Sequence, residues 1–194
     1  MVHIPNEWFF FNPYVKSNYK ILKKISRKTG IVFFKNNNTN PQSEFFFTIK
    51  PYIDWCRKKR IKFILPSSLY WANKYKAFGI FVDNKKRKLN FSINLKTIKK
   101  KYFIATKVHN IFEGLNSSDC DFIFISPVFK TNSFPKKKPL SRYFFLSLCL
   151  LMKKKKNFAL GGVNKLNYKK LKNKNIHGFG GISNFNYFGI SNDI

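Results

Sequence analysis

Acidic residues and cysteines are the side chains that this sequence has least of. Eight Asp and Glu residues stand against 38 Lys and Arg residues, which gives a formal net charge of +30 over 194 residues. The three cysteines, Cys56, Cys120 and Cys149, are odd in number and widely spaced, so they offer neither a disulfide framework nor metal-ligand spacing. We therefore expect buried cysteines in a reducing, cytoplasmic environment.

Long apolar runs are also absent. The longest uncharged apolar stretch, residues 143–152, is much shorter than the ~20 residues that a membrane-spanning helix needs. The N-terminus has no basic segment followed by an apolar one, so we expect no signal peptide and no membrane partner. The hydrophobic fraction of 44% nevertheless supports a packed core, and without a visible linker we expect one domain over residues 1–194.

The excess of positive charge, taken alone, suggests a nucleic acid, an acidic surface or a phosphorylated ligand as partner. Lysine far outnumbers arginine, however, and Phe, Asn, Ile and Tyr are abundant as well. These residue types share AT-rich codons, so we interpret much of the charge as compositional drift. The lysine runs, such as 99–101 and 153–156, are short and scattered, which is typical of a solvated surface. A basic nucleic-acid-binding protein remains the alternative from another functional class.

Short apolar runs rich in β-formers recur along the chain, and segments with helical spacing separate most of them. The runs are continuous, as expected for strands buried on both faces of a parallel sheet. Alternation of this kind predicts an α/β protein, and eight strands favour a closed (β/α)8 TIM barrel. The predicted strands are residues 8–11, 31–34, 63–65, 79–82, 102–105, 122–125, 158–160 and 178–179.

The helical segments complete this prediction, although the chain lies at the short end for such a barrel, which usually has about 200 residues or more. The unit at 84–101 has the weakest pattern, so its fourth helix is expected to be short or irregular. The other predicted helices are residues 19–25, 44–55, 69–77, 111–115, 140–152 and 166–171.

Two glycine pairs, Gly161-Gly162 and Gly180-Gly181, each follow a short apolar run. Paired glycines after a buried strand let the backbone approach a ligand, and free N–H groups in such a turn can hold an anion. In a (β/α)8 barrel the chemistry lies at the C-terminal ends of the strands. We therefore expect a phosphate site there, beside Lys107, His109 and Asp83, the only clear carboxylate at that end.

Residues 102–183 resemble the thiamine phosphate synthase/TenI family of single-domain (β/α)8 barrels. The resemblance rests on Thr106-Lys-Val-His109 and on the stretch Ser126-Pro-Val-Phe-Lys-Thr-Asn-Ser133, which is its most specific part. Ala159-Leu-Gly-Gly-Val163 and Gly178-Phe-Gly-Gly-Ile-Ser183 complete it in order and spacing. Before Tyr102 the similarity is only a pattern of strands.

The resemblance implies an enzyme of thiamine biosynthesis that joins hydroxymethylpyrimidine diphosphate to thiazole phosphate and releases diphosphate, with Mg²⁺ as cofactor. Its small-molecule partners would be these phosphorylated pyrimidine and thiazole compounds, and a homo-oligomer stays open. By the same resemblance Thr131 and Ser133 would contact the diphosphate. The thiazole phosphate would be held by Gly161, Gly162, Ile182 and Ser183.

The sequence departs from the family pattern mainly where the metal would bind. The family's Asn-Asp pair after the third strand aligns with Pro66-Ser67, and a second metal-binding Asp has only the displaced Asp83 as a substitute. The family's two cations after the second strand meet Phe34-Lys35, which leaves Lys35. Lys107 replaces a serine and is a candidate to supply the missing charge. The phosphate end is therefore better preserved than the metal end.

His109 supports an alternative within the same family. TenI-like relatives that lack synthase activity isomerise a thiazole carboxylate phosphate, and a histidine at this place takes part in proton transfer. Histidine suits acid–base work near neutral pH. A thiazole tautomerase and a non-catalytic thiazole-phosphate binder thus remain open, as does a histidine with no role beyond the first turn of a helix.

Overall fold

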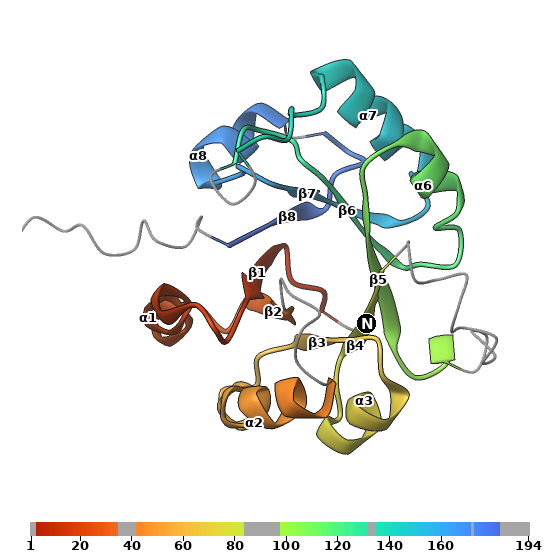
Figure 1. The fold of residues 1–194 in the computed structure, drawn as a ribbon. Coiled ribbons are helices and arrows are strands. Elements are labelled where there is room, and N and C mark those ends of the chain that lie inside the picture. The colour runs from red at the N-terminus through yellow and green to blue at the C-terminus, as the bar shows by residue number, and fades with distance from the viewer. Residues whose placement is uncertain (1–2, 35–41, 84–97, 132–134, 172, 183–194) are drawn as a thin grey trace, which may run out of the picture.

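A computed structural model of the chain describes residues 3–34, 42–83, 98–131, 135–171 and 173–182. Eight parallel strands follow one another around a closed barrel in chain order, and the last pairs with the first. The predicted α/β barrel is therefore confirmed, with the strands at the centre and the helices outside (Figure 1). The strands are β1 (Glu7–Phe11), β2 (Thr29–Phe33), β3 (Phe63–Pro66), β4 (Gly79–Val82), β5 (Phe103–Val108), β6 (Phe122–Ile125), β7 (Lys156–Leu160) and β8 (Gly178–Gly181).

Helices connect most of these strands, as the spacing of apolar residues predicts. The weak unit expected at 84–101 lies mostly outside the described residues, so its helix stays a prediction. The described helices are α1 (Lys16–Lys24), α2 (Gln42–Lys58), α3 (Leu69–Tyr75), α6 (Ile111–Leu115), α7 (Arg142–Leu151) and α8 (Lys165–Tyr168), which continues into the 3₁₀ turn η1 (Lys169–Leu171).

Several helices begin at a polar residue that caps the first turn. Ser141 Oγ accepts a hydrogen bond from the Phe144 N–H at 3.2 Å, and Asn110 Oδ1 accepts one from the Glu113 N–H at 2.8 Å. Such caps satisfy backbone donors that have no partner inside the helix. They set where α7 and α6 start, just beyond the loops that follow β6 and β5.

Two strands are longer than the sequence indicates. Strand β5 was expected to end at Ala105 but runs to Val108, because it pairs with β4 on one side and β6 on the other. Strand β8 was expected to end at Phe179 but runs to Gly181, since Gly180 pairs with Trp8 and Leu160. The expectation that Gly180-Gly181 forms a turn is therefore wrong: Gly180 pairs with strands on both sides and Gly181 pairs with Phe9, so both glycines belong to the sheet.

The core has two shells, which follow from the alternation of side chains along each strand. Phe9 and Phe11 pack outward, between the barrel and the helices, whereas Trp8 and Phe10 point into the barrel. Trp8 is fully buried and packs against other aromatic rings. The inner shell consists of Trp8, Phe10, Val32, Ile64, Ala105, Phe122, Phe124, Phe158 and Leu160.

The three cysteines are buried and unpaired with one another, as the sequence predicts. Burial raises the pKa of the Cys56 and Cys149 thiols to about 12, so these thiols stay protonated and unreactive near neutral pH. Within the described ranges, no helix is both long and apolar enough to cross a membrane.

Candidate functional site

A layer of phenylalanine rings closes the barrel below the C-terminal ends of its strands. Phe10 lies at the centre of the layer, with ring centroids 5.9 Å from Phe34, 6.0 Å from Phe81 and 5.0 Å from Phe124. Phe34 and Phe81 are only partly buried, so the layer is not fully covered by protein. We call these four rings the aromatic floor. It gives the expected site an apolar base.

Lys107 lies at the rim of this floor. On β5, Ala105 belongs to the inner shell and Phe103 packs against it, whereas Ile104 and Val108 belong to the outer shell. Side chains alternate along a strand, so Lys107 points into the barrel. It pairs in register with Phe124 of the aromatic floor and is half-buried. The strand thus brings a cation to the inner edge of an apolar surface.

Asp83 lies next to this position. Val82, the last residue of β4, pairs with Thr106 of β5, and the Thr106 hydroxyl donates a hydrogen bond to the Val82 carbonyl at 2.7 Å. Asp83 and Lys107 directly follow these two paired residues. The structure therefore brings together the expected carboxylate and the expected cation on neighbouring strands.

His109 follows β5 and is fixed on two sides. Its backbone N–H donates to Glu113 Oε2 at 2.7 Å, and its ring nitrogen Nδ1 hydrogen-bonds the Ser126 carbonyl. A carbonyl oxygen only accepts, so Nδ1 carries the proton and Nε2 is the basic nitrogen. Burial is the main reason that the pKa of His109 lies below 6.5, and the charges of Lys107 and Lys137 lower this pKa further. The hydrogen bond to Ser126 and the negative charge of Glu113 act in the opposite direction and raise it. The ring is neutral at pH 7.

The loop after β6 lies over the end of β7. The Val128 N–H donates to the Leu160 carbonyl, and the Phe129 N–H donates to the Gly161 carbonyl, each at 3.0 Å. The Ser126–Pro127 peptide bond is cis. This loop, residues 126–131, is the most specific motif of the sequence, and it brings the half-buried Thr131 to the C-terminal side of the barrel.

The glycine pair after β7 is required by the packing of this turn. Gly161 and Gly162 have φ values of 87° and 66°, which residues with side chains rarely adopt. A Cβ atom on Gly162 would lie 2.3 Å from the Lys130 carbonyl oxygen, and one on Gly161 would lie 3.0 Å from Pro127. The pair thus forms the expected turn. The absence of side chains at these two positions lets the turn after β7 pack against the loop after β6.

Two asparagines that the sequence analysis did not single out hold this turn in place. Asn164 Oδ1 accepts hydrogen bonds from the Leu166 and Asn167 N–H groups, at 3.0 and 2.8 Å. The Asn167 side chain donates to the Gly162 carbonyl at 2.8 Å and accepts from the Asn164 N–H at 2.7 Å. The sequence signal is the spacing Asn-x-x-Asn that begins one residue beyond the glycine pair, because this spacing allows a capping box.

The remaining expected site residues divide between described and undescribed parts of the chain. Ile182 follows β8 and packs, partly buried, against the inner shell. Lys35, Ser133 and Ser183 lie outside the described residues, so their expected roles stay predictions.

The donor set at this end of the barrel does not suit a divalent metal ion. Magnesium prefers oxygen ligands, chiefly carboxylates. In the part of the chain that the structure describes, no three His, Cys, Asp or Glu residues gather as a metal site would require. Asp83 and Lys107 each follow a residue of the last β4–β5 register pair, and Glu113 accepts a hydrogen bond from the His109 backbone N–H. The Mg²⁺ expected from the family resemblance therefore does not match these residues.

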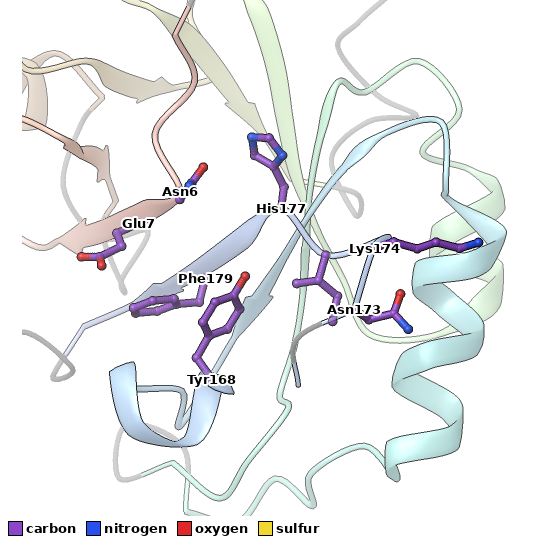
Figure 2. A pocket seen from close by; sticks show the side chains of 8 residues that line it. Asn6, Glu7, Tyr168, Asn173, Lys174, His177 and Phe179 are labelled. Atoms are coloured by element: carbon purple, nitrogen blue, oxygen red, sulfur yellow. The ribbon is translucent and has the colours of Figure 1, made fainter. Parts of the chain in front are cut away.

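A cavity of about 600 Å³ lies at the opposite end of the barrel, where β1 and β8 begin (Figure 2). Tyr168 and Phe179 form one wall, with ring centroids 4.9 Å apart, and the Glu7 carboxylate lies 3.6 Å from Lys165 Nζ. Chemistry in (β/α)8 barrels takes place at the other end. The cavity is therefore separate from the site described above. Its lining is Asn6, Glu7, Tyr168, Asn173, Lys174, Ile176, His177 and Phe179.

Comparison with known proteins gives a consistent result. The family model described as thiamine monophosphate synthase matches residues 16–185. A curated thiamine-phosphate synthase from Prochlorococcus marinus subsp. pastoris is 32% identical over 132 residues, which are 62% of this chain and 34% of that protein. This chain thus spans about a third of the length of that relative.

Two solved structures are also similar. A thiamine phosphate pyrophosphorylase from Pyrococcus furiosus matches with a TM-score of 0.66 at 18% identity, over 92% of this chain and 86% of that one. Its counterpart from Bacteroides thetaiotaomicron matches with a TM-score of 0.57 at 14% identity, over 98% and 89%. At these identities the likeness concerns the fold alone.

Proposed function

This chain belongs to the thiamine monophosphate synthase family, and from that membership we propose that it joins hydroxymethylpyrimidine diphosphate to thiazole phosphate, releasing diphosphate. The reaction would serve thiamine biosynthesis in the cytoplasm. The observation that carries the proposal is the contact between the loop after β6 and the glycine turn after β7, where the Phe129 N–H donates to the Gly161 carbonyl at 3.0 Å. The contact joins the two most family-like motifs at the catalytic end of a barrel.

The two phosphate groups are assigned to two parts of this end. Thr131, together with Ser133, would donate hydrogen bonds to the diphosphate. The thiazole phosphate would sit against the backbone of Gly161, Gly162 and Ile182, and against Ser183. Backbone N–H groups in a turn with positive φ values can surround an anion, and Gly161 and Gly162 have such values.

The aromatic floor supports planar heterocycles as substrates. Pyrimidine and thiazole rings are flat, and phenylalanine rings favour offset-stacked or edge-to-face contacts with such partners. The floor would therefore orient the rings while polar groups at the rim hold their phosphates, which is the usual division of labour in ligand pockets.

The chemistry demands stabilisation of negative charge. As the bond between the pyrimidine methylene and the diphosphate breaks, its electron pair leaves with the diphosphate, and the thiazole then bonds the methylene carbon. Donors and cations fixed in advance around the departing group lower this barrier. Lys107, half-buried at the rim of the floor, and Lys35 are the lysines we assign to this task.

A product assay tests the proposal. Purified protein is incubated with both substrates, with Mg²⁺ or with EDTA, and thiamine phosphate is quantified by chromatography. Thr131→Val should lower kcat/KM by roughly tenfold or more, as expected for loss of a hydrogen bond to a charged group. Thr48→Val, a half-buried residue on α2 that lies outside the candidate site, is the matched control. Absence of both product and thiazole-phosphate binding would overturn the proposal.

A thiazole tautomerase is the second candidate, and the geometry of His109 favours it. With Nδ1 donating to the Ser126 carbonyl, the neutral ring has Nε2 available to accept a proton and return it. In that case His109→Gln should abolish tautomer exchange, followed by NMR, while thiazole-phosphate binding persists. Unchanged exchange in the variant would remove His109 from the mechanism.

A further inference from the structure

We infer that the candidate site binds a diphosphate group without a divalent cation, using Lys107 at the inner end of β5 as the counter-charge. The inference deepens the proposed function, because the diphosphate is that of the proposed pyrimidine substrate. It concerns how the charge of this group is neutralised, and it is separable by experiment from whether the protein turns substrates over.

The positions of the carboxylates are the first argument. The sequence holds eight acidic residues, and most of the described ones lie away from the strand ends in question. Glu44 and Asp54 are exposed on α2, Asp119 and Asp121 precede β6, and Glu7 begins β1. Among the described carboxylates, only Asp83 and Glu113 belong to segments that directly follow the C-terminal end of a strand, and the eighth acidic residue, Asp193, lies outside the described residues.

The undescribed stretches of the chain hold few acidic residues. The sequence stretches 35–41, 84–97 and 132–134 contain no Asp, Glu, His or Cys, and 183–194 contains the single carboxylate Asp193. Magnesium is commonly held by one or two carboxylates together with substrate phosphates. Asp83 could supply one, but it and Lys107 each directly follow a residue of the last β4–β5 register pair, so the positive charge of Lys107 opposes a cation at this end of the two strands. The local charge pattern therefore favours an anion over a metal ion.

Lys107 has the position that a counter-charge needs. Its neighbours in the sheet are inner-shell residues, Ala105 on its own strand and Phe124 on the next. Ion–ion attraction is stronger beside such apolar surface than in open water, because little water screens the charges. An ammonium group is also a point-charge binder of phosphate. Burial is the first cause of the lowered pKa of His109, and the further lowering by Lys107 and Lys137 is consistent with positive charge near this rim.

Calorimetric titration with inorganic diphosphate tests the inference on the full chain. We expect binding in EDTA to be at least as tight as in Mg²⁺, since Mg²⁺ would mask the charge of the ligand. In EDTA, Lys107→Gln should weaken binding by roughly tenfold or more, whereas Lys107→Arg should stay close to the wild type. Lys174→Gln, at the opposite end of the barrel, is the control that removes the same charge.

Asp83→Asn separates the two models further. A metal-free site should bind diphosphate as tightly or more tightly after this change, because a like charge is removed from beside the anion. A metal site built on Asp83 should lose its Mg²⁺-dependent binding. Circular dichroism confirms that each variant is folded, and the comparison of EDTA with Mg²⁺ on the wild type depends on no variant.

The outcomes distinguish this inference from the proposed function. Binding that appears only with Mg²⁺, no binding in either buffer, or equal loss in Lys107→Gln and Lys174→Gln would each overturn the inference. Product formation that requires Mg²⁺, together with Mg²⁺-dependent diphosphate binding, would leave the proposed function intact. Tight binding in EDTA without any product from the two substrates would support the inference and contradict the proposed synthase.

Discussion

Gly162 shows how a single residue connects two motifs of the site. It lies between the loop after β6 and the start of α8, and the Asn167 side chain donates to its carbonyl at 2.8 Å. A side chain at this position would meet the Lys130 carbonyl oxygen and the Cβ atom of Phe129. Because both loops carry expected site residues, strain at Gly162 affects the whole C-terminal face.

Gly162→Ala should therefore destabilise the protein by about 1–3 kcal/mol, the cost typical of a left-handed residue with a side chain. The matched control is Gly114→Ala in α6, where a Cβ atom would meet nothing closer than 3.5 Å. There we expect a gain of about 0.5–1 kcal/mol, because alanine favours the helix. Urea unfolding measures both free energies. Equal effects of the two changes would contradict our account of the turn.

His109 gives stability a pH dependence of known sign. Its pKa in the folded protein lies below 6.5, first because of burial, so the unfolded chain binds the proton more readily. The free energy of unfolding should therefore be highest above pH 6.5 and fall as the pH drops towards the folded pKa. His109→Gln should flatten this slope in urea titrations. A slope that is unchanged in the variant would assign it to other groups, His177 first among them.

How far the sequence predicts a residue's role depends on whether its neighbours are local. The expected turn at Gly161-Gly162 is confirmed, since paired glycines after a strand carry their own backbone preference. The direction of Lys107 was not readable, because the expected strand ended at Ala105. Only the pairing of Val108 with Ile125 extends β5 far enough to point Lys107 inward.

At the scale of elements, strand β8 closes the barrel by passing very close to β1. A Cβ atom on Gly180 would lie 2.9 Å from Phe10 Cε2 and 3.3 Å from Phe124 Cε1. Glycine at this place leaves room for the rings of the aromatic floor. The sequence interpretation of Gly180-Gly181 as a ligand-binding turn missed this reason, because the crowding comes from a strand about 170 residues earlier.

A double-mutant cycle measures this crowding. Gly180→Ala alone should cost about 1–3 kcal/mol, as overpacking does. In the background of Phe10→Leu, which removes the ring that the new methyl group would meet, the same change should cost less. We expect a coupling energy of roughly 0.5–3 kcal/mol between the two sites. Additive effects in chemical unfolding would show that Phe10 does not limit the space at Gly180.

At the scale of the whole molecule, the inside and the surface differ sharply in chemistry. The inner shell is largely aromatic, whereas 38 basic residues against eight acidic ones leave a net charge of +30. An aromatic interior packs tightly and needs glycines where strands approach. A surface of one dominant sign repels itself and attracts any polyanion.

Added salt should therefore raise the unfolding temperature at low ionic strength, because the screening length falls to about 10 Å at 0.1 M. Binding to nucleic acid should be weak, insensitive to sequence and lost steeply as salt increases. Fluorescence melting and anisotropy titrations over a salt series check both statements. Tight, sequence-dependent binding that survives high salt would favour the nucleic-acid-binding alternative over drift of the surface composition.

The sequence by itself determined the order of eight strands, the alternation with helices and the family motifs, because each of these depends on residues that are close together in the chain. The tertiary structure decided what no local pattern contains. It points Lys107 into the barrel next to the end of β4, places Gly180 against Phe10 and joins the β6 loop to the β7 turn by hydrogen bonds. These features depend on which strands pair when the barrel closes, and closure brings together residues that are far apart in the chain.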